Sequence, residues 1–148
     1  IEWAKDGKTG ELFILQARPE TVHGRKQALT VKEYKLKTKA QPLCTGKAVG
    51  HAIASGRACI VASLADAHKV REGDIIVADI TNPDWNALLR KAVSIVTNKG
   101  GRTSHASIVA RELGIHAVVG TGNATGILRD GQSVEVDGDS GVVRMLPR

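Results

Sequence analysis

Apolar residues along this chain gather in short runs that are separated by glycine, proline and polar turns. These runs predict strands near residues 43–51, 57–62, 74–79, 93–97, 117–119, 132–136 and 141–146. Helical spacing of apolar residues occurs at only two places, near residues 84–91 and 104–113, and Gly114 is expected to end the second helix. Short strands with two helices predict a layered α/β fold.

The first twenty residues form a unit of their own. Two apolar segments, 1–4 and 12–16, flank a polar turn and predict a β-hairpin. A lone hairpin is marginally stable in water, so we expect it to complete a domain that precedes this segment. Residues 21–36 are polar and lack periodicity, which predicts a linker. The remaining residues, 37–148, are expected to fold as the main domain.

Composition narrows the class of protein. The chain has 148 residues, a net charge of +6 and only 3% aromatic residues. Its basic excess lies in residues 25–39, where aromatic residues for stacking are nearly absent, which disfavours a nucleic-acid partner. It begins at Ile1 and has no secretory or membrane-spanning run, so we expect an internal fragment of a cytoplasmic protein. Cys44 and Cys59 are expected to be reduced and partly buried.

One histidine stands where a flexible loop meets a helix. The run from Gly100 to His105 follows the apolar segment 94–98 and leads into the second predicted helix. The first N–H groups of a helix have no partner within it and the helix dipole adds positive charge, so an anion binds well there. A neutral imidazole is a nucleophile near physiological pH and can carry a phosphoryl group. This setting favours His105 as a phosphoryl acceptor.

The neighbours of this histidine fit a phosphate site but also permit a simpler interpretation. Gly100 and Gly101 let the backbone approach a phosphate closely, and the hydroxyl groups of Thr103 and Ser104 can donate hydrogen bonds. In the simpler interpretation the two glycines form only a turn, Ser104 only caps the helix, and His105 lies on an exposed face. Spacing alone leaves both interpretations open.

Three other features have structural interpretations. Trp85 is expected to pack at the start of the first helix rather than to bind a ligand, and Asp84 is expected to cap that helix. Residues 137–141 are typical of a hairpin connection and lack the further ligands that a calcium loop needs.

A family resemblance rests on residues 100–115, which read Gly-Gly-Arg-Thr-Ser-His-Ala-Ser-Ile-Val-Ala-Arg-Glu-Leu-Gly-Ile. Together with Ala-Val-Val-Gly at 117–120, this segment resembles the phosphohistidine segment of the phosphoenolpyruvate-utilising enzymes. Within the family, residues 81–85 and the start of the chain look most like the enzymes that convert ATP, pyruvate and water to AMP, phosphoenolpyruvate and phosphate. One departure is His116, where the family usually has proline, and it places a second histidine nearby.

The resemblance implies a fold and a function. The fold is a swivelling β/β/α phosphohistidine domain preceded by the terminal hairpin of an ATP-grasp domain. The full-length protein would be a phosphotransferase with paired acceptors. His105 would take the β-phosphate of ATP and pass it to pyruvate. The terminal phosphate of ATP would be lost to water. The fragment alone is not expected to turn over, because it holds neither the rest of the ATP site nor an acceptor site.

The resemblance also assigns roles to single residues. Loop residues Gly100, Gly101, Thr103 and Ser104 would support the phosphate, and Thr103 would be phosphorylated by a bifunctional regulatory kinase/phosphorylase. In the hairpin, Glu2 would hold magnesium, Gln16 would contact the nucleotide and Arg18 would face the ATP phosphates. Most Mg²⁺ ligands would come from other domains.

The expected partners are the ATP-grasp and pyruvate-binding domains of the same polypeptide. Neither nucleic acid nor a membrane is expected as a partner. The full-length enzyme could form a homodimer, but the sequence does not decide this. Two alternatives to this function remain at this point. One is the carrier domain of a related dikinase or antibiotic phosphotransferase, and the other is a noncatalytic docking module.

Overall fold

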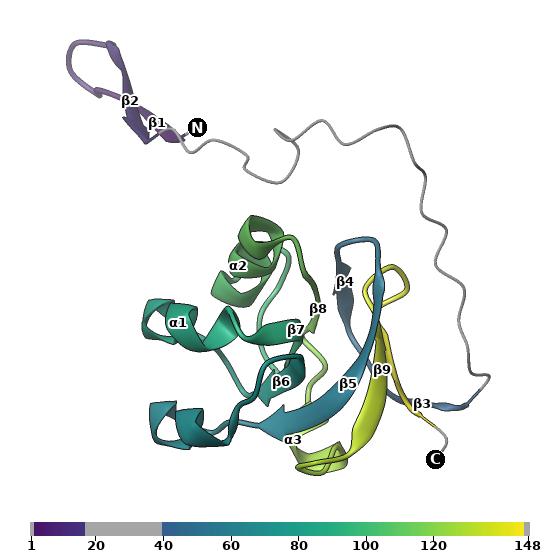
Figure 1. Cartoon of the computed structure of the whole chain (residues 1–148). Coiled ribbons are helices and arrows are strands. Elements are labelled where there is room, and N and C mark those ends of the chain that lie inside the picture. Colours follow the sequence, from purple (N-terminus) through teal and green to yellow (C-terminus); the bar gives the residue numbers. More distant parts are fainter. Residues whose placement is uncertain (1, 17–39, 147–148) are drawn as a thin grey trace, which may run out of the picture.

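Two parts of the chain, residues 2–16 and 40–146, are described by the computed structural model (Figure 1). The strands are β1 (Glu2–Lys5), β2 (Leu12–Gln16), β3 (Pro42–Thr45), β4 (Lys47–Val49), β5 (Ile53–Ile60), β6 (Asp74–Ala78), β7 (Ala92–Thr97), β8 (His116–Val119), β9 (Ser133–Asp137) and β10 (Val142–Met145). The α-helices are α1 (Asn86–Leu89), α2 (His105–Leu113) and α3 (Ala124–Ile127), and the 3-10 helices are η1 (Leu64–Lys69) and η2 (Pro83–Trp85). None of these described helices is long and apolar enough to cross a membrane.

Strands β1 and β2 form the antiparallel hairpin that the sequence predicted. Its turn is closed by Asp6, whose carboxylate accepts hydrogen bonds from the backbone N–H groups of Thr9 at 2.7 Å and Lys8 at 2.8 Å. These bonds, led by the one from Thr9, lower the pKa of the Asp6 carboxyl group. Large apolar side chains such as Trp3 and Phe13 are exposed, so the described residues of the hairpin bury no core.

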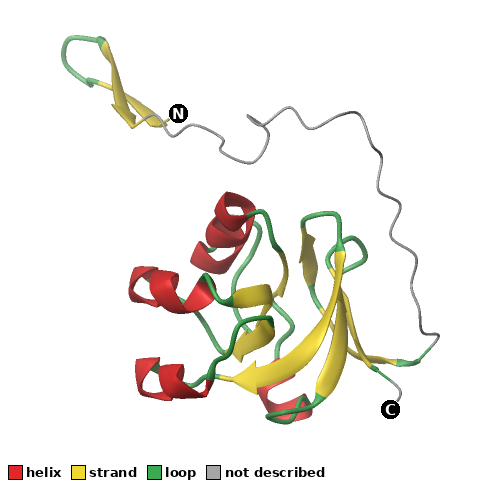
Figure 2. Cartoon of the chain, in the orientation of Figure 1, coloured by secondary structure: helices red, strands yellow, loops and turns green. Residues whose placement is uncertain are grey.

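The other eight strands form one sheet in the order β3-β10-β9-β5-β6-β7-β8-β4. Neighbouring strands from β5 to β8 run parallel, whereas the pairs at both ends of the order are antiparallel. Figures 1 and 2 show α1 and α2 on one side of the parallel strands, with β9 and β3 on the other. The strands and helices therefore form the β/β/α layers that the resemblance implied.

Strands β3 and β4 stand at opposite ends of the sheet although only Gly46 separates them in the chain. The N–H of Gly46 donates to the carbonyl oxygen of Gly141 at 2.8 Å. A side chain at this corner would place its Cβ 2.6 Å from the carbonyl oxygen of Val119, so only glycine fits. The prediction of one continuous strand over 43–51 was wrong because the chain turns at Gly46 and closes the sheet upon itself.

Alternate residues of the parallel strands supply two separate cores. In β6, Ile76 packs with Leu89 in the cluster under the helices, whereas Ile75 and Val77 pack with Val134 in the cluster between the strand layers. Because both faces are buried, the parallel strands are unbroken apolar runs in the sequence. This explains why the sequence located β6, β7 and β8 to within one residue at each end.

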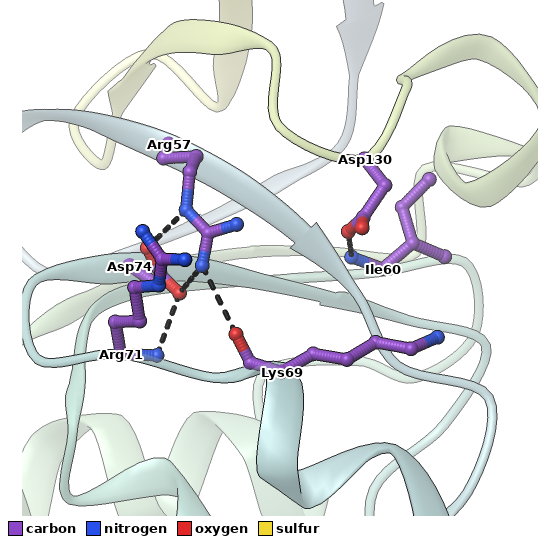
Figure 3. A network of polar contacts seen from close by, with 6 residues as sticks. All are labelled: Arg57, Ile60, Lys69, Arg71, Asp74 and Asp130. Carbon is purple, nitrogen blue, oxygen red and sulfur yellow. Dashed lines mark hydrogen bonds and ion pairs between the residues drawn. The ribbon is translucent and has the colours of Figure 1, made fainter.

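A polar network ties the start of β6 to β5, and Figure 3 shows its members. The guanidinium of Arg57 donates to both carboxylate oxygens of Asp74, at 3.0 and 2.5 Å, and to the carbonyl oxygen of Lys69 at 3.0 Å. Asp74 also accepts from the backbone N–H of Arg71 at 2.8 Å. The side chain of Asp74 is only 5% exposed, so these partners compensate its loss of water. The hydrogen bonds from Arg57 to Asp74, together with the negative charge of Asp74, raise the pKa of Arg57.

Three elements differ from the sequence prediction. The helices η1 and α3 were not predicted because each is too short to show a period. Strand β5 begins at Ile53 rather than near residue 57, since its first half pairs with β9 and only its second half with β6. The small and polar residues of that first half gave no apolar run.

The two cysteines are free, as expected, and they are buried more fully than expected. Cys44 lies in the core between the strand layers and Cys59 in the core under the helices. Burial raises the pKa of the Cys44 thiol to about 11 and also raises the pKa of Cys59. Both thiols are therefore protonated and inert near neutral pH.

Candidate active site

His105 is the first residue of α2, at the point where the loop after β7 becomes the helix. Its ring is half-buried, and its two nitrogens have partners in the connection after β6 and at the start of α1. Oγ1 of Thr81 lies 2.9 Å from Nδ1, and Oδ1 of Asn86 lies 3.0 Å from Nε2. These two contacts bring the end of β6 and the start of α1 to the helix that carries the candidate nucleophile.

The two partners of the ring suit a neutral imidazole with one ring hydrogen. In the tautomer with that hydrogen on Nε2, this nitrogen donates to Oδ1 of Asn86, which can only accept. Nδ1 then accepts from the hydroxyl of Thr81. Burial lowers the pKa of His105, and the smaller attraction of Glu112 opposes that change. The imidazole is therefore neutral near pH 7, which a nucleophile requires.

The glycine loop before His105 is held in a tight turn. Gly100 has φ of +114°, and a side chain there would place its Cβ 2.9 Å from Oγ of Ser104. The carbonyl oxygen of Gly101 accepts from the N–H of Ser104 at 3.0 Å and from the hydroxyl of Ser107 at 2.7 Å. The free N–H groups of the first helical turn lie directly after this turn, so the loop and helix offer an anion site.

The two predicted hydroxyl groups differ in their surroundings. Ser104 occupies the N-cap position with a half-buried side chain, and its Oγ lies 3.2 Å from Oγ of Ser107 rather than capping the helix. Thr103 is exposed at the corner of the turn. Its hydroxyl is therefore the more accessible of the two to another protein.

Asn98 fastens the loop to its surroundings, a role that the sequence did not reveal. The buried side chain of Asn98 donates to Asp79 at 3.1 Å and to the hydroxyl of Thr125 at 2.7 Å, and accepts from the N–H of Thr125 at 3.1 Å. Lys99 pairs with the same Asp79 at 2.7 Å, and these two contacts lower the pKa of that carboxyl group. The ends of β6 and β7 and the start of α3 are thus joined just before Gly100.

Positive side chains surround the loop. The Nζ atom of Lys47 in β4 lies 3.8 Å from the position where a Cβ on Gly101 would stand. Arg111 of α2 donates from Nη1 to the carbonyl oxygen of Arg102 at 2.8 Å. These charges add to the helix dipole and favour a negative ligand at the loop.

The second histidine of the motif region lies in a different setting. His116 is buried in β8, and a Cβ on Gly50 or Gly138 would collide with its side chain. Nε2 of His116 has no hydrogen-bond partner among the described residues, and burial lowers its pKa. A group with so little access cannot meet a phosphate donor without opening the sheet.

The hairpin residues assigned by resemblance are only partly described. Glu2 and Gln16 face each other in the register of β1 and β2, but their side chains lie outside the described residues. Arg18 lies outside the described residues altogether. Their proposed roles toward nucleotide and metal therefore remain predictions.

The segment before α1 corrects one expectation. Asn82, not Asp84, caps η2, because Oδ1 of Asn82 accepts from the N–H of Asp84 at 3.1 Å. Trp85 is buried in the core under the helices, as expected. The family resemblance places the segment 81–85 near the histidine loop, but sequence reasoning did not single out Thr81 or Asn86 as partners of the histidine. The signal available was their position after β6, since residues at the carboxyl ends of neighbouring parallel strands meet.

Comparison with known families matches both parts of the chain. Residues 70–141 match the family described as PEP-utilising enzyme, mobile domain, and residues 1–39 match that described as pyruvate phosphate dikinase, AMP/ATP-binding domain. The phosphoenolpyruvate synthase of Aquifex aeolicus is 54% identical over 151 residues, covering 97% of this chain and 18% of that protein. The phosphoenolpyruvate synthase of Pseudomonas aeruginosa is 51% identical over 146 residues, again covering 97% of this chain and 18% of that protein.

Solved structures share the fold. A chain in the crystal structure of Thermococcus kodakaraensis aconitase X (holo-form) has a TM-score of 0.53 and 16% identity, covering 70% of this chain and 98% of its own length. At this identity the similarity concerns the fold alone.

Proposed function

Because the chain belongs to the family of PEP-utilising enzymes, we propose that His105 is the residue through which this domain carries a phosphoryl group. The observation that carries the proposal is the position of a neutral, half-buried imidazole at the first turn of α2, beside a glycine turn. Its two hydrogen bonds, with Thr81 and Asn86, hold the ring in one orientation. Preorganisation of this kind lowers the entropy cost of transfer.

The nitrogen that takes the phosphoryl group is Nε2. Thr81, which holds Nδ1, is buried, whereas Asn86, which faces Nε2, is exposed. A phosphate donor therefore approaches from the side of Nε2. For attack, the ring proton must sit on Nδ1, where the hydroxyl oxygen of Thr81 accepts it, so that Nε2 presents its lone pair.

The full-length protein, on this proposal, converts ATP, pyruvate and water to AMP, phosphoenolpyruvate and phosphate. Attack on the β-phosphorus releases AMP, the terminal phosphate is lost to water, and the remaining phosphoryl group passes from His105 to pyruvate. The match of residues 1–39 to an AMP/ATP-binding domain supports ATP as the donor. The chain spans 18% of the length of these curated relatives. The remaining parts of the full-length protein would therefore hold most of both substrate sites.

The hairpin and the loop keep the roles that the family suggests. Glu2, Gln16 and Arg18 would serve the ATP site as ligands to metal, nucleotide and phosphates. Thr103 would be the target of a regulatory kinase/phosphorylase, and its exposure at the turn supports that role. Residues 21–36 would connect the two sites, since sixteen extended residues span about 50 Å.

Magnesium would neutralise phosphate charge when bound. Among residues 2–16 and 40–146, no three His, Cys, Asp or Glu side chains are placed to hold one ion. The described side chains therefore do not fit a metal site of their own, and their contribution to the phosphate charge is made by the helix end, Lys47 and Arg111.

The experiment that tests this function runs the acceptor half-reaction backwards. Full-length enzyme incubated with phosphoenolpyruvate labelled in its phosphoryl group should gain an acid-labile label and release pyruvate. The variant His105→Ala should gain none, while His68→Ala, which changes an exposed histidine, should label like the wild type. Full labelling of His105→Ala would overturn the proposal.

A further inference from the structure

Asn86 holds the ring nitrogen that faces the phosphate donor. Its Oδ1 lies 3.0 Å from Nε2 of His105, and the residue is exposed at the start of α1. The backbone on either side is fixed, because Trp85 and Leu88 are buried in the core under the helices. The amide group is therefore held at one place while its side chain remains free to turn.

With its oxygen toward Nε2, this amide opposes the reaction. A carbonyl oxygen accepts hydrogen bonds but donates none, so its contact requires a proton on Nε2. A protonated Nε2 of a neutral ring has no lone pair with which to attack phosphorus. In this orientation Asn86 thus stabilises the unreactive tautomer of His105.

A half-turn of the amide reverses this effect. It exchanges Oδ1 for Nδ2, which donates two hydrogen bonds and accepts none. The solvent then takes the proton from Nε2 and returns one to Nδ1, while the hydroxyl of Thr81 changes from donor to acceptor. The proton count of the ring is unchanged, and Nε2 gains its lone pair.

We propose that Asn86 is a positioning residue that selects the tautomer of His105 and, after transfer, donates from Nδ2 to the phosphoryl group on Nε2. This inference rests on the function proposed for His105. In the transfer, the Nε2 lone pair forms the bond to phosphorus and the bond from phosphorus to the leaving oxygen breaks, with its electron pair going to the leaving group. Nδ1 keeps its proton, so the phosphorylated ring is cationic, and the amide hydrogen bond stabilises the anionic phosphoryl oxygens.

An amide is the side chain that this role requires, because it can present either an acceptor or a donor from one position. A carboxylate at residue 86 would accept in both orientations and would repel the phosphoryl group. Alanine would leave Nε2 to water. The variants Asn86→Asp and Asn86→Ala therefore separate the two parts of the proposal.

The first measurement concerns the unphosphorylated ring and does not depend on catalysis. Nitrogen-15 chemical shifts of the histidine side chains in this chain report which nitrogen carries the proton. Wild type and Asn86→Asp should hold the proton mainly on Nε2, and Asn86→Ala should show a larger fraction on Nδ1. The signal of buried His116 reports whether each variant is folded.

The second measurement uses phosphoramidate to phosphorylate His105 in the same chain, followed by phosphorus-31 spectra of the hydrolysis of phosphohistidine. Loss of one hydrogen bond to a charged group should accelerate hydrolysis about tenfold in Asn86→Ala, and Asn86→Asp should hydrolyse faster still. The control Arg90→Gln, an exposed change at the end of α1, should match the wild type.

Equal tautomer fractions and equal hydrolysis rates in wild type and Asn86→Ala would overturn the role of Asn86. That outcome differs from a failure of the proposed function, which would appear as full-length enzyme that takes no label on His105 from phosphoenolpyruvate. The two results are therefore read from different samples and different signals.

Discussion

Oγ1 of Thr81 lies 2.9 Å from Nδ1 of His105, and this hydrogen bond joins the connection after β6 to the first residue of α2. Thr81 is buried while the ring is half-buried, so the contact orients the imidazole from its inner side. The nitrogen on the outer side contacts the exposed Asn86.

Replacement of Thr81 by valine keeps the shape of the side chain but removes the partner of Nδ1. We expect Thr81→Val to lower the rate of His105 phosphorylation about tenfold, since the reactive tautomer loses its acceptor on Nδ1. The rate of label uptake by full-length enzyme under single-turnover conditions measures this effect. The matched change Thr45→Val, at an exposed threonine of β3, should leave the rate unchanged; equal rates in all three proteins would contradict the role of Thr81.

Acid should destabilise the folded chain through its buried histidine. Burial lowers the pKa of His116 below its ordinary value of 6.5, so below that pH the unfolded state binds a proton that the native state does not. The contribution of neutral His116 to the free energy of unfolding should therefore be fully present above pH 6.5. It should decrease as the pH falls toward the lowered pKa of His116 in the folded state. Urea unfolding from pH 7.5 to 5 measures this slope.

The variant His116→Asn should flatten that slope, because asparagine does not titrate. His68→Asn, at an exposed position, provides the matched control and should retain the slope of the wild type. An unchanged slope in His116→Asn would show that other groups cause the acid sensitivity.

The ion pair between Arg57 and Asp74 should contribute strongly to stability. Their side chains are 30% and 5% exposed, and removal of one charge leaves the other partly buried without compensation. We expect Asp74→Asn to lower the free energy of unfolding by about 3 kcal/mol. The pair of Lys69 with Asp66, whose side chains are more exposed than that of Asp74, offers a control. Lys69→Gln should cost much less than Asp74→Asn, and similar losses in both variants would contradict the importance of burial.

A negative charge at Thr103 should block the site. The residue lies at the corner of the turn, two positions before His105, where an added carboxylate or phosphate repels the incoming phosphate. Thr103→Asp should suppress labelling of His105 far more than Thr103→Val does. Equal labelling of the two variants would remove the electrostatic explanation, and failure of a regulatory kinase to modify Thr103 would remove the regulatory one.

The sequence predicted those parts of the molecule in which one local signal decides the structure. Gly100 and Gly114 mark the turn before α2 and its end, and Gly114 indeed ends the helix with φ of 70°. Strands buried on both faces, such as β6, were visible as apolar runs. The position of His105 at the helix start followed from the same signals.

The remaining features depend on residues that meet only in the fold. At Gly46 the chain turns and divides one predicted strand into two. The carbonyl oxygen of Val119, far along the chain, leaves no room for a side chain at this turn. The hydrogen bond between Asn86 and His105 joins residues that are nineteen positions apart, and no pattern in either segment specifies it. Asn98 likewise has its partners far along the chain, Asp79 after β6 and Thr125 in α3.

The location of the phosphoryl group after reaction with ATP tests the central claim most directly. Full-length enzyme is incubated with ATP labelled at the β-phosphate, digested under alkaline conditions, and the labelled peptide is sequenced by mass spectrometry. We predict label on His105 in the wild type and in His116→Asn, and none in His105→Asn. Label on His116, or label that persists in His105→Asn, would contradict the assignment of His105 as the phosphoryl carrier.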